Sequence, residues 1–176
     1  MRQRPGREVL TAYVRGHSPW PWAGWQYGAA TPPEPDENQL ASLQFRKPDV
    51  QAVISILGRR KANEDDEALL LARVDLRRAY LRRANLERAN LRNSSLRGVQ
   101  GRNARLRGAV LKQSDLTRAL LQDADLREAD LQRADLSGAM LIGTDLRGAA
   151  LEGAVLRGVV ADGSTRWPEG FTPPNA

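Results

Sequence analysis

Apolar residues recur with a period of five from residue 69 to residue 163. Each five-residue unit, or quintet, has an apolar central position and a small residue two positions before it, as in residues 124–128 (ADLRE) and 129–133 (ADLQR). Nineteen consecutive quintets fit this frame, and Leu occupies the central position in seventeen of them, the exceptions being Gly101 and Ala161. A fixed internal period of this kind is interpreted first, because it decides the fold.

The five-residue period fits neither a helix nor a flat strand. On an α-helix, each quintet would rotate the apolar stripe by about 140°, so the stripe would wind around the whole circumference. On a strand, the small residue and the Leu share one face, but the next quintet begins on the opposite face. A chain that turns a corner every five residues points every small residue and every Leu inward, with coils stacked about 4.8 Å apart.

The A(D/N)LXX register resembles the pentapeptide-repeat family over residues 69–163, just over half of the chain. The resemblance implies an all-β solenoid, a right-handed quadrilateral β-helix with four quintets per coil. Nineteen quintets would then give almost five coils, a rod of roughly 23 Å. Residues 1–68 are expected to form a helical and linker region, and residues 164–176 a C-terminal cap and tail in which Trp167 and Phe171 cover the open end.

Two short helices are predicted before the repeats. Residues 7–17 place apolar side chains at helical spacing, and Gly16 with the nearby Pro19 is expected to end this helix. Residues 47–58 form a second amphipathic pattern, with Pro48 in the first turn and Gly58 at the end. Residues 18–36 are rich in Pro, Gly and Trp and are predicted to be a loop, either a partner-binding surface or a cover for the solenoid.

The blocks EVLTAYVRGHSPWP and KPDVQAVISILGRR, at residues 8–21 and 47–60, resemble the segment before the repeats in a group of actinobacterial pentapeptide-repeat proteins. Longer members of that group carry further helices and often a membrane segment upstream. The resemblance implies that this chain is a truncated relative or a fragment.

With four quintets per coil, residues twenty apart stack in columns. One column reads Arg107, Arg127 and Arg147 beside Asp125 and Asp145, a solvated face of alternating charge that contributes little to stability. Another outward column places apolar residues on the C-terminal half. Its predicted self-association strip consists of Leu120, Met140, Ile142 and Val160. Two alternatives stay open for this strip: dimerisation or partner binding, and burial under the Trp-rich loop.

Charge is polarised along the repeats, since residues 69–112 carry a net charge of +10 and residues 113–163 a net charge of −4. This asymmetry indicates a polyanion or an acidic partner at the basic end. The candidate patch consists of Arg77, Arg78, Arg82, Arg83, Arg97, Arg102, Arg105 and Arg107.

The composition argues against an enzyme. The chain has no Cys, a single His, no Gly-rich phosphate loop and no metal-ligand spacing, so no catalytic, cofactor or metal site is expected. His17 is interpreted as a helix-end residue. There is no apolar run of the roughly 18 residues that span a bilayer and no signal-peptide core, so a cytoplasmic protein is expected.

Three binding functions remain. The first is a non-enzymatic solenoid that presents charged ladders to a protein partner. The second is a DNA-mimicking topoisomerase-binding protein, as in the acidic quinolone-resistance members of the family, although this chain has a net charge of +6. The third is nucleic-acid binding by the basic coils, where Tyr80 is the one interleaved aromatic residue.

The two breaks in the Leu column are expected to be repacked core sites. Val99 and Val159 stand where Ala is usual, two positions before Gly101 and Ala161, and restore part of the lost volume.

Overall fold

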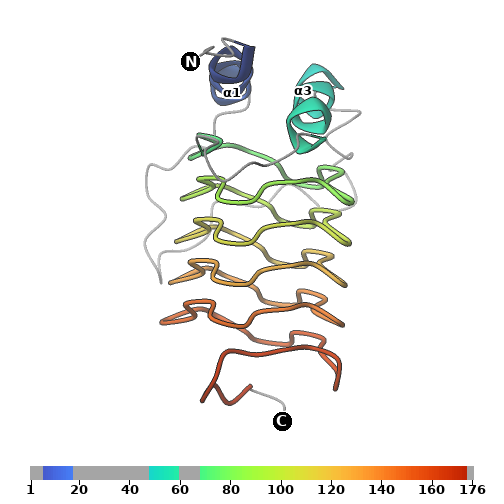
Figure 1. The fold of residues 1–176 in the computed structure, drawn as a ribbon, viewed down its shortest axis with the longest axis vertical. Helices are drawn as coiled ribbons and strands as arrows, with labels where there is room; N and C mark the ends of the chain where they lie inside the picture. Colours follow the sequence, from blue (N-terminus) through green and yellow to red (C-terminus); the bar gives the residue numbers. More distant parts are fainter. Residues whose placement is uncertain (1–5, 18–47, 60–67, 174–176) are drawn as a thin grey trace, which may run out of the picture.

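The computed structural model describes residues 6–17, 48–59 and 68–173. Helix α1 (Gly6–His17) and helix α3 (Pro48–Gly58) lie over the N-terminal end of a stack of coils that runs to the C-terminus (Figure 1). Both predicted helices are confirmed, each to within one residue of its expected start. Gly16 lies inside α1 rather than ending it, since the helix continues to His17.

The coils are held together by a backbone ladder with a fixed twenty-residue register. Isolated parallel bridges join Leu70 to Asn90, Asp75 to Ser95 and so on at every fifth residue, which gives four quintets per coil. Within the described residues, each bridge is a single residue and no extended strand forms. Each quintet contributes up to three bonds between coils, as in Leu106 N–H to Asp125 O (2.8 Å), Gly108 N–H to Arg127 O (2.8 Å) and Asp125 N–H to Ala104 O (2.9 Å).

Each corner of the coil is a turn whose third residue is left-handed. In residues 126–129, the Ala129 N–H donates to Leu126 O (3.1 Å) and Glu128 has a φ of 60°. This is the geometry of a type II turn, which requires positive φ at its third position. The last position of each of the first eighteen quintets has positive φ, and in eleven of them the residue is not Gly. The ladder therefore holds in place a conformation that costs an ordinary residue about 1 kcal/mol.

The Asp or Asn of the repeat has a structural role of its own. Its side-chain oxygen accepts the backbone N–H two residues later, as Asp130 does from Gln132 (3.0 Å) and Asp135 from Ser137 (2.8 Å). A short polar side chain can make this local bond and so supports the turn. The Asp or Asn of the repeat is therefore explained by its support of the turn and does not indicate a catalytic or binding site.

The interior consists of stacked Leu side chains with Ala between them. The Leu residues from Leu86 to Leu146 at the central positions are almost completely inaccessible to solvent. Where Ser or Thr replaces the Ala, its hydroxyl is bonded to a carbonyl of the backbone: Thr144 Oγ1 donates to Leu121 O (2.8 Å). Ser94 Oγ donates to Leu71 O (3.0 Å) and accepts the Val74 N–H (3.1 Å), so it closes a turn in the coil before its own.

Helix α3 supplies the first coil with the partners that a preceding coil would supply. The Gln51 side chain accepts the Tyr80 N–H (2.9 Å) and donates to Tyr80 O (3.0 Å), and Gly58 O accepts the Asn85 N–H (2.7 Å). A Cβ on Gly58 would lie 2.8 Å from the Ala84 Cβ, so this close approach requires glycine. Helix α1 packs against α3 and buries Val14.

The C-terminal end completes the fifth coil after a one-residue insertion. Asp145 pairs with Arg166, twenty-one residues away, whereas all the other bridges span twenty. The insertion lies in a turn closed by Asp162, which accepts the Ser164 N–H (3.0 Å), and it places Trp167 at the central position of a twentieth quintet. The Trp167 ring stacks on Phe171 with centroids 5.4 Å apart, and both pack against the end of the core.

The two breaks in the Leu column differ in kind. Gly101 is buried, and the atom nearest to a Cβ built on it is Leu121 Cδ2 at 2.9 Å, so a side chain from the next coil fills its space. Val99 is not among the three nearest neighbours of that Cβ. Ala161 is exposed, because no full coil stacks beyond it. Gly101 is therefore a repacked core site, as expected, although the atom nearest to its Cβ position belongs to Leu121 and not to Val99. At Ala161 the expectation of a core site is wrong, because this residue is exposed.

Replacing Leu131 tests the inward register. Leu131→Asp places an unpaired carboxylate in the core and should abolish folding, while Leu131→Ala should lower the free energy of unfolding by about 3 kcal/mol. Gln132→Ala, one residue along and facing outward, is the matched control and should change it little. Urea unfolding followed by circular dichroism measures all three, and a Leu131→Ala variant as stable as its control would contradict the register.

The contact between Gly101 and Leu121 predicts a coupling across coils. Gly101→Ala alone should cost about 1–2 kcal/mol, because its Cβ meets Leu121 Cδ2. In a Leu121→Ala background this cost should disappear, since the space is then empty. Equal costs of Gly101→Ala in the two backgrounds, measured by urea unfolding, would show that Leu121 does not fill the site.

Candidate interaction faces

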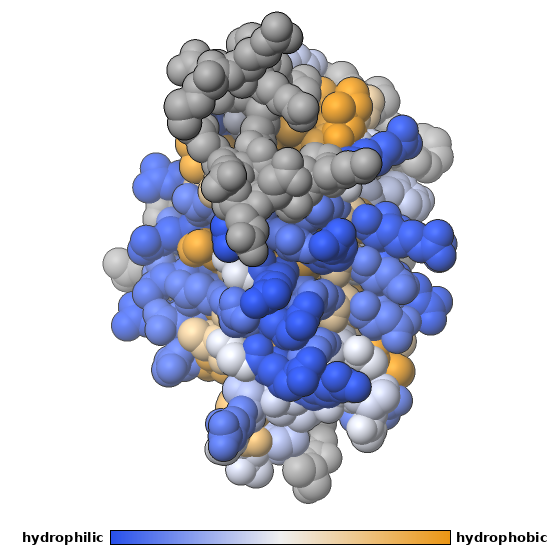
Figure 2. All heavy atoms as spheres, viewed as in Figure 1, coloured by the Kyte–Doolittle hydropathy of each residue, from blue (hydrophilic) through white to orange (hydrophobic). Residues whose placement is uncertain are grey.

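The four sides of the coil give the protein four faces, each a column of outward residues. Face 1 contains positions 70, 90, 110, 130 and 150, and face 2 contains 75, 95, 115, 135 and 155. Face 3 contains 80, 100, 120, 140 and 160, and face 4 contains 85, 105, 125, 145 and 166. The residue two positions after each of these adds a second outward column to the same face. Hydrophilic side chains cover most of the side seen in Figure 2, where apolar side chains are visible in small separate areas.

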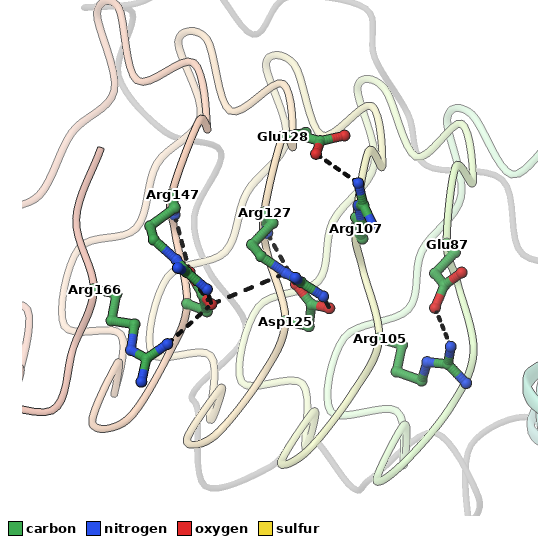
Figure 3. A network of polar contacts seen from close by, with 9 residues as sticks. Glu87, Arg105, Arg107, Asp125, Arg127, Glu128, Arg147 and Arg166 are labelled. Atoms are coloured by element: carbon green, nitrogen blue, oxygen red, sulfur yellow. Dashed lines mark hydrogen bonds and ion pairs between the residues drawn. The ribbon is translucent and has the colours of Figure 1, made fainter. Parts of the chain in front are cut away.

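Face 4 is an internally compensated ladder of ion pairs (Figure 3). Arg127 and Arg147 each make a two-point contact with the aspartate two residues earlier, at 2.7 Å from Asp125 and from Asp145 respectively. Between coils, Arg105 pairs with Glu87 (2.6 Å) and Arg107 with Glu128 (2.7 Å). The predicted alternation is present, but the carboxylate that contacts Arg107 is Glu128 at the corner rather than Asp125.

These pairs shift the aspartate pKa values downward. The hydrogen bonds from Arg127 hold the pKa of Asp125 below its ordinary value, and those from Arg147 do the same for Asp145. Because the arginines of these pairs are 38% and 54% exposed, the pairs add little to stability. Any partner that binds face 4 has to compete with contacts that its charges already make.

Asp115 on face 2 has the opposite environment. Burial raises the pKa of the Asp115 carboxyl, against hydrogen bonds from Thr117 and from Ser95 that lower it. The Thr117 N–H (2.9 Å) and Thr117 Oγ1 (2.6 Å) both donate to Asp115 Oδ1, and Ser95 Oγ donates to Oδ2 (3.2 Å). This carboxylate is half-buried and is held within its column by these three hydrogen bonds.

The predicted basic patch is divided among three faces. Arg77 and Arg97 lie on face 2, Arg82 and Arg102 on face 3, and Arg105 and Arg107 on face 4. Arg78 and Arg83 are corner residues that follow faces 2 and 3. Three of these positions are occupied by firm contacts within the chain: Arg77 is bound to Asp75 at 2.9 Å, and Arg105 and Arg107 belong to the face 4 ladder. Arg82 and Arg83 are exposed and form no ion pair among the described residues, and Arg102 approaches Asp123 at 3.7 Å.

The apolar strip is assembled on face 3. Leu120, Met140 and Val160 are consecutive members of one bridge column, and Ile142 lies in the outward column beside Met140. Val160 is 46% exposed and the other three are partly exposed. Tyr80, at the other end of the same column, is 36% exposed. The Trp-rich loop that could cover this strip lies outside the described residues, so that alternative is not tested.

Face 3 also carries an acidic residue that the patch and strip left out. Asp162 occupies the last position of the column that begins with Arg82 and Arg102, and it is exposed. The twenty-residue period was sufficient to place Asp162 in this column, because Asp162 lies eighty residues, or four coils, after Arg82. Face 3 is thus basic at its N-terminal end, apolar from its centre onward and acidic at its C-terminal end.

No described group of side chains forms a metal or catalytic centre. Within residues 6–17, 48–59 and 68–173, no three His, Cys, Asp or Glu side chains converge as metal ligands would. His17 stacks on Tyr13, and its Nδ1 lies 2.9 Å from Tyr13 O at the end of α1. Neither α1 nor α3 has the length and apolar character of a membrane-spanning helix.

The pentapeptide-repeat model, described as "Pentapeptide repeats", matches eight copies over residues 70–100, 102–128 and 119–158. The matches cover half of the chain. The protein belongs to the pentapeptide-repeat family. The family resemblance inferred from the quintets is confirmed, and no curated protein matches the chain.

The solved structures to which the chain is similar include pentapeptide-repeat proteins. HetL, a protein involved in heterocyst differentiation regulation from the cyanobacterium Nostoc sp. strain PCC 7120, is 29% identical, with 54% of this chain and 55% of HetL covered and a TM-score of 0.48. The protein alr5209 from the same organism is 43% identical over 56% of this chain and 77% of its own, with a TM-score of 0.31. QnrB1, a plasmid-mediated fluoroquinolone resistance protein, is 22% identical over 58% and 69%, with a TM-score of 0.27. The pentapeptide-repeat chain thus spans about half the length of HetL.

Two aspartates of this pentapeptide-repeat chain should respond to pH with opposite signs. Asp115→Asn keeps an acceptor for Thr117 and removes a buried charge, so it should melt at or above the parent temperature at pH 7. The difference in melting temperature between Asp115→Asn and the parent should shrink as the pH falls, because Asp115 in the parent becomes protonated at its raised pKa.

Asp125→Asn supplies the matched comparison on face 4. It should melt below the parent at neutral pH, and the loss should fade only as the pH falls below the ordinary value of 3.8, since the pKa of Asp125 is lowered. Melting curves between pH 3 and pH 7 measure both variants. Parallel pH profiles for the two would contradict the assignment.

Proposed function

We propose that the protein is a non-enzymatic interaction module that presents face 3 to a protein partner. Membership of the family supports the scaffold, which we infer to be the right-handed quadrilateral β-helix that the repeats imply. The observation that carries the proposal is the contrast between faces. On face 3, the exposed Arg82, which forms no ion pair among the described residues, lies on the same surface as an apolar column.

The rigidity of the scaffold favours binding through such a surface. The outward side chains are fixed in columns by the backbone ladder, so little main-chain entropy is lost when a partner docks. Partly exposed Leu120, Met140 and Ile142 offer apolar area, and exposed contiguous apolar area usually marks an interaction site. Arg82 and Arg83 add charge that a partner can reach without breaking an existing pair.

Faces 4 and 2 support the proposal less well. On face 4, a partner would have to displace the pairs of Arg127 and Arg147 with their aspartates. On face 2, Arg77 is tied to Asp75 by two hydrogen bonds and Asp115 is withdrawn into its column. Binding to either face would exchange satisfied contacts for new ones with little net gain.

A second candidate is polyanion binding at the N-terminal end of face 3. Arg82, Arg83 and Arg102 lie in two adjacent columns on neighbouring coils, close to the exposed Tyr80. Arginine side chains and an aromatic ring together suit a nucleic-acid backbone and base. DNA mimicry towards a topoisomerase has less support, because a mimic needs a continuous negative surface and this end of the rod is basic.

Affinity capture with face-specific variants tests the proposal. Tagged full-length chain is used on a lysate of the source organism with quantitative mass spectrometry. Leu120→Glu with Met140→Glu should reduce recovery of specific partners at least tenfold. The control, Asp125→Asn with Arg127→Gln, removes one ion pair from face 4 without changing net charge and should keep them.

Two other outcomes would overturn the protein-partner proposal. Recovery of the same partners by the face 3 variant would exclude face 3 as the docking surface. Partners lost on nuclease treatment, together with binding to labelled DNA or RNA that Arg82→Glu with Arg83→Glu abolishes, would favour the polyanion candidate instead.

A further inference from the structure

The charges on face 3 are ordered along the rod. The first coil contributes Arg82, the second Arg102, and the last Asp162, while the central coil presents the uncharged pair Leu120 and Gln122. Arg83 and Asp123 belong to the corner column that follows face 3. Asp123, at the corner of the central coil, is 3.7 Å from Arg102. A face that is positive at one end, negative at the other and uncharged in the middle is complementary to its own reverse.

We place a second copy against face 3 by a two-fold rotation about an axis that passes through the central coil, perpendicular to the rod. Each column then lies against the same column of the partner, running in the opposite direction. Leu120 then meets the partner's Leu120, Gln100 meets the partner's Met140, and Tyr80 meets the partner's Val160. In the second column, Arg82 meets the partner's Asp162, and the stem of Arg102 lies over the partner's Ile142. Leu120 with Leu120 and Tyr80 with Val160 join apolar groups, and Arg82 with Asp162 joins opposite charges. Gln122 lies against the partner's Gln122, so no contact in the two columns opposes like charges, and the face is complementary to its own reverse as an isologous interface requires.

The same operation on the other three faces opposes like charges. On face 1 it places Lys112 against itself, on face 2 it places Asp115 against itself and Arg77 against the partner's Arg157, and on face 4 it places Arg127 against itself. Among the described residues, face 3 is the face whose centre is uncharged and whose ends carry opposite signs. We therefore propose that two copies of this chain pack antiparallel through face 3.

This inference rests on the proposed function, because it names the occupant of the same face. The span from Tyr80 to Val160 covers five coils, about 20 Å at sheet spacing, so the interface is smaller than the roughly 800 Å² per partner of a standard complex. The dimer is accordingly one that exchanges, with a dissociation constant on the order of tens of micromolar. Raising the salt from about 50 mM to 500 mM should weaken it, since Arg82 and the partner's Asp162 lie at the exposed rim.

Sedimentation equilibrium of the full chain is the first measurement. Between about 5 µM and 500 µM, the mass should rise from 19.5 kDa towards twice that value. Leu120→Glu should raise the dissociation constant at least tenfold, because it places two carboxylates against each other on the axis. A parent that stays monomeric over the whole range overturns the proposal.

The absence of cysteine from the chain allows a sharper test of the register. Leu120→Cys should form a disulfide-linked dimer on mild oxidation, because the two copies meet at residue 120. Val110→Cys is the matched control, since Val110 lies in the same coil, is also partly exposed and belongs to face 1. Equal cross-linking of the two variants overturns the proposal.

Orientation is tested by mixing two further variants. Tyr80→Cys and Val160→Cys, four coils apart in one chain, should cross-link efficiently when mixed and poorly when either is alone. A fast cross-link of Tyr80→Cys with itself would show a parallel arrangement and overturn the antiparallel one.

The two proposals fail separately. A monomeric parent that still loses partners in the Leu120→Glu, Met140→Glu variant overturns the antiparallel dimer and leaves the docking face. A dimer with no partner that depends on face 3 leaves the dimer and overturns the proposed function.

Discussion

The backbone ladder between coils is the constraint on which the other features of this protein depend. Because every bridge but the last joins residues twenty apart, a side chain cannot change its face without breaking bonds in two coils. The ladder also holds eleven non-glycine residues in a left-handed conformation that they would not adopt alone. The leucine core, the corners and the columns on each face all follow from this register.

The same constraint separates two kinds of surface. On face 4, an aspartate that supports the corner is two residues from an arginine, so the turn and the ion pair are made by one side chain. On face 3, the corresponding column contains Tyr80, Gln100, Leu120, Met140 and Val160, none of which makes this bond. The side chains of this column therefore do not stabilise the turns that follow them, and they remain available for contacts outside the chain.

The period of five was sufficient to predict a corner at every fifth residue and the inward residues, because these depend on spacing alone. The four quintets per coil that the family resemblance implied then gave the membership of each column. Spacing could not predict contacts that depend on side-chain conformation or on the ends of the rod. The space beside Gly101 is filled by the Leu121 side chain of the neighbouring coil, a contact that the spacing does not specify. Arg107 could reach either Asp125 or Glu128, and the sequence does not decide between them. The hydrogen bonds from Gln51 to Tyr80 and the insertion before Trp167 occur at the two ends of the rod. A coil is missing on one side there, so the repeat pattern does not specify the contacts.

Because the ladder repeats every twenty residues, the number of coils can change without changing the face on which any remaining residue lies. The N-terminal partners come from α3, and the C-terminal insertion lies after residue 160, so neither end depends on the number of coils between them. Removal of one whole coil, for example residues 109–128, would join Gly108 to Ala129 with every remaining residue still on its own face. Duplication of the same segment would lengthen the rod by one coil. Evolution or design can therefore adjust the reach of the molecule in steps of about 4.8 Å, whereas a deletion of five residues would rotate everything after it by one face.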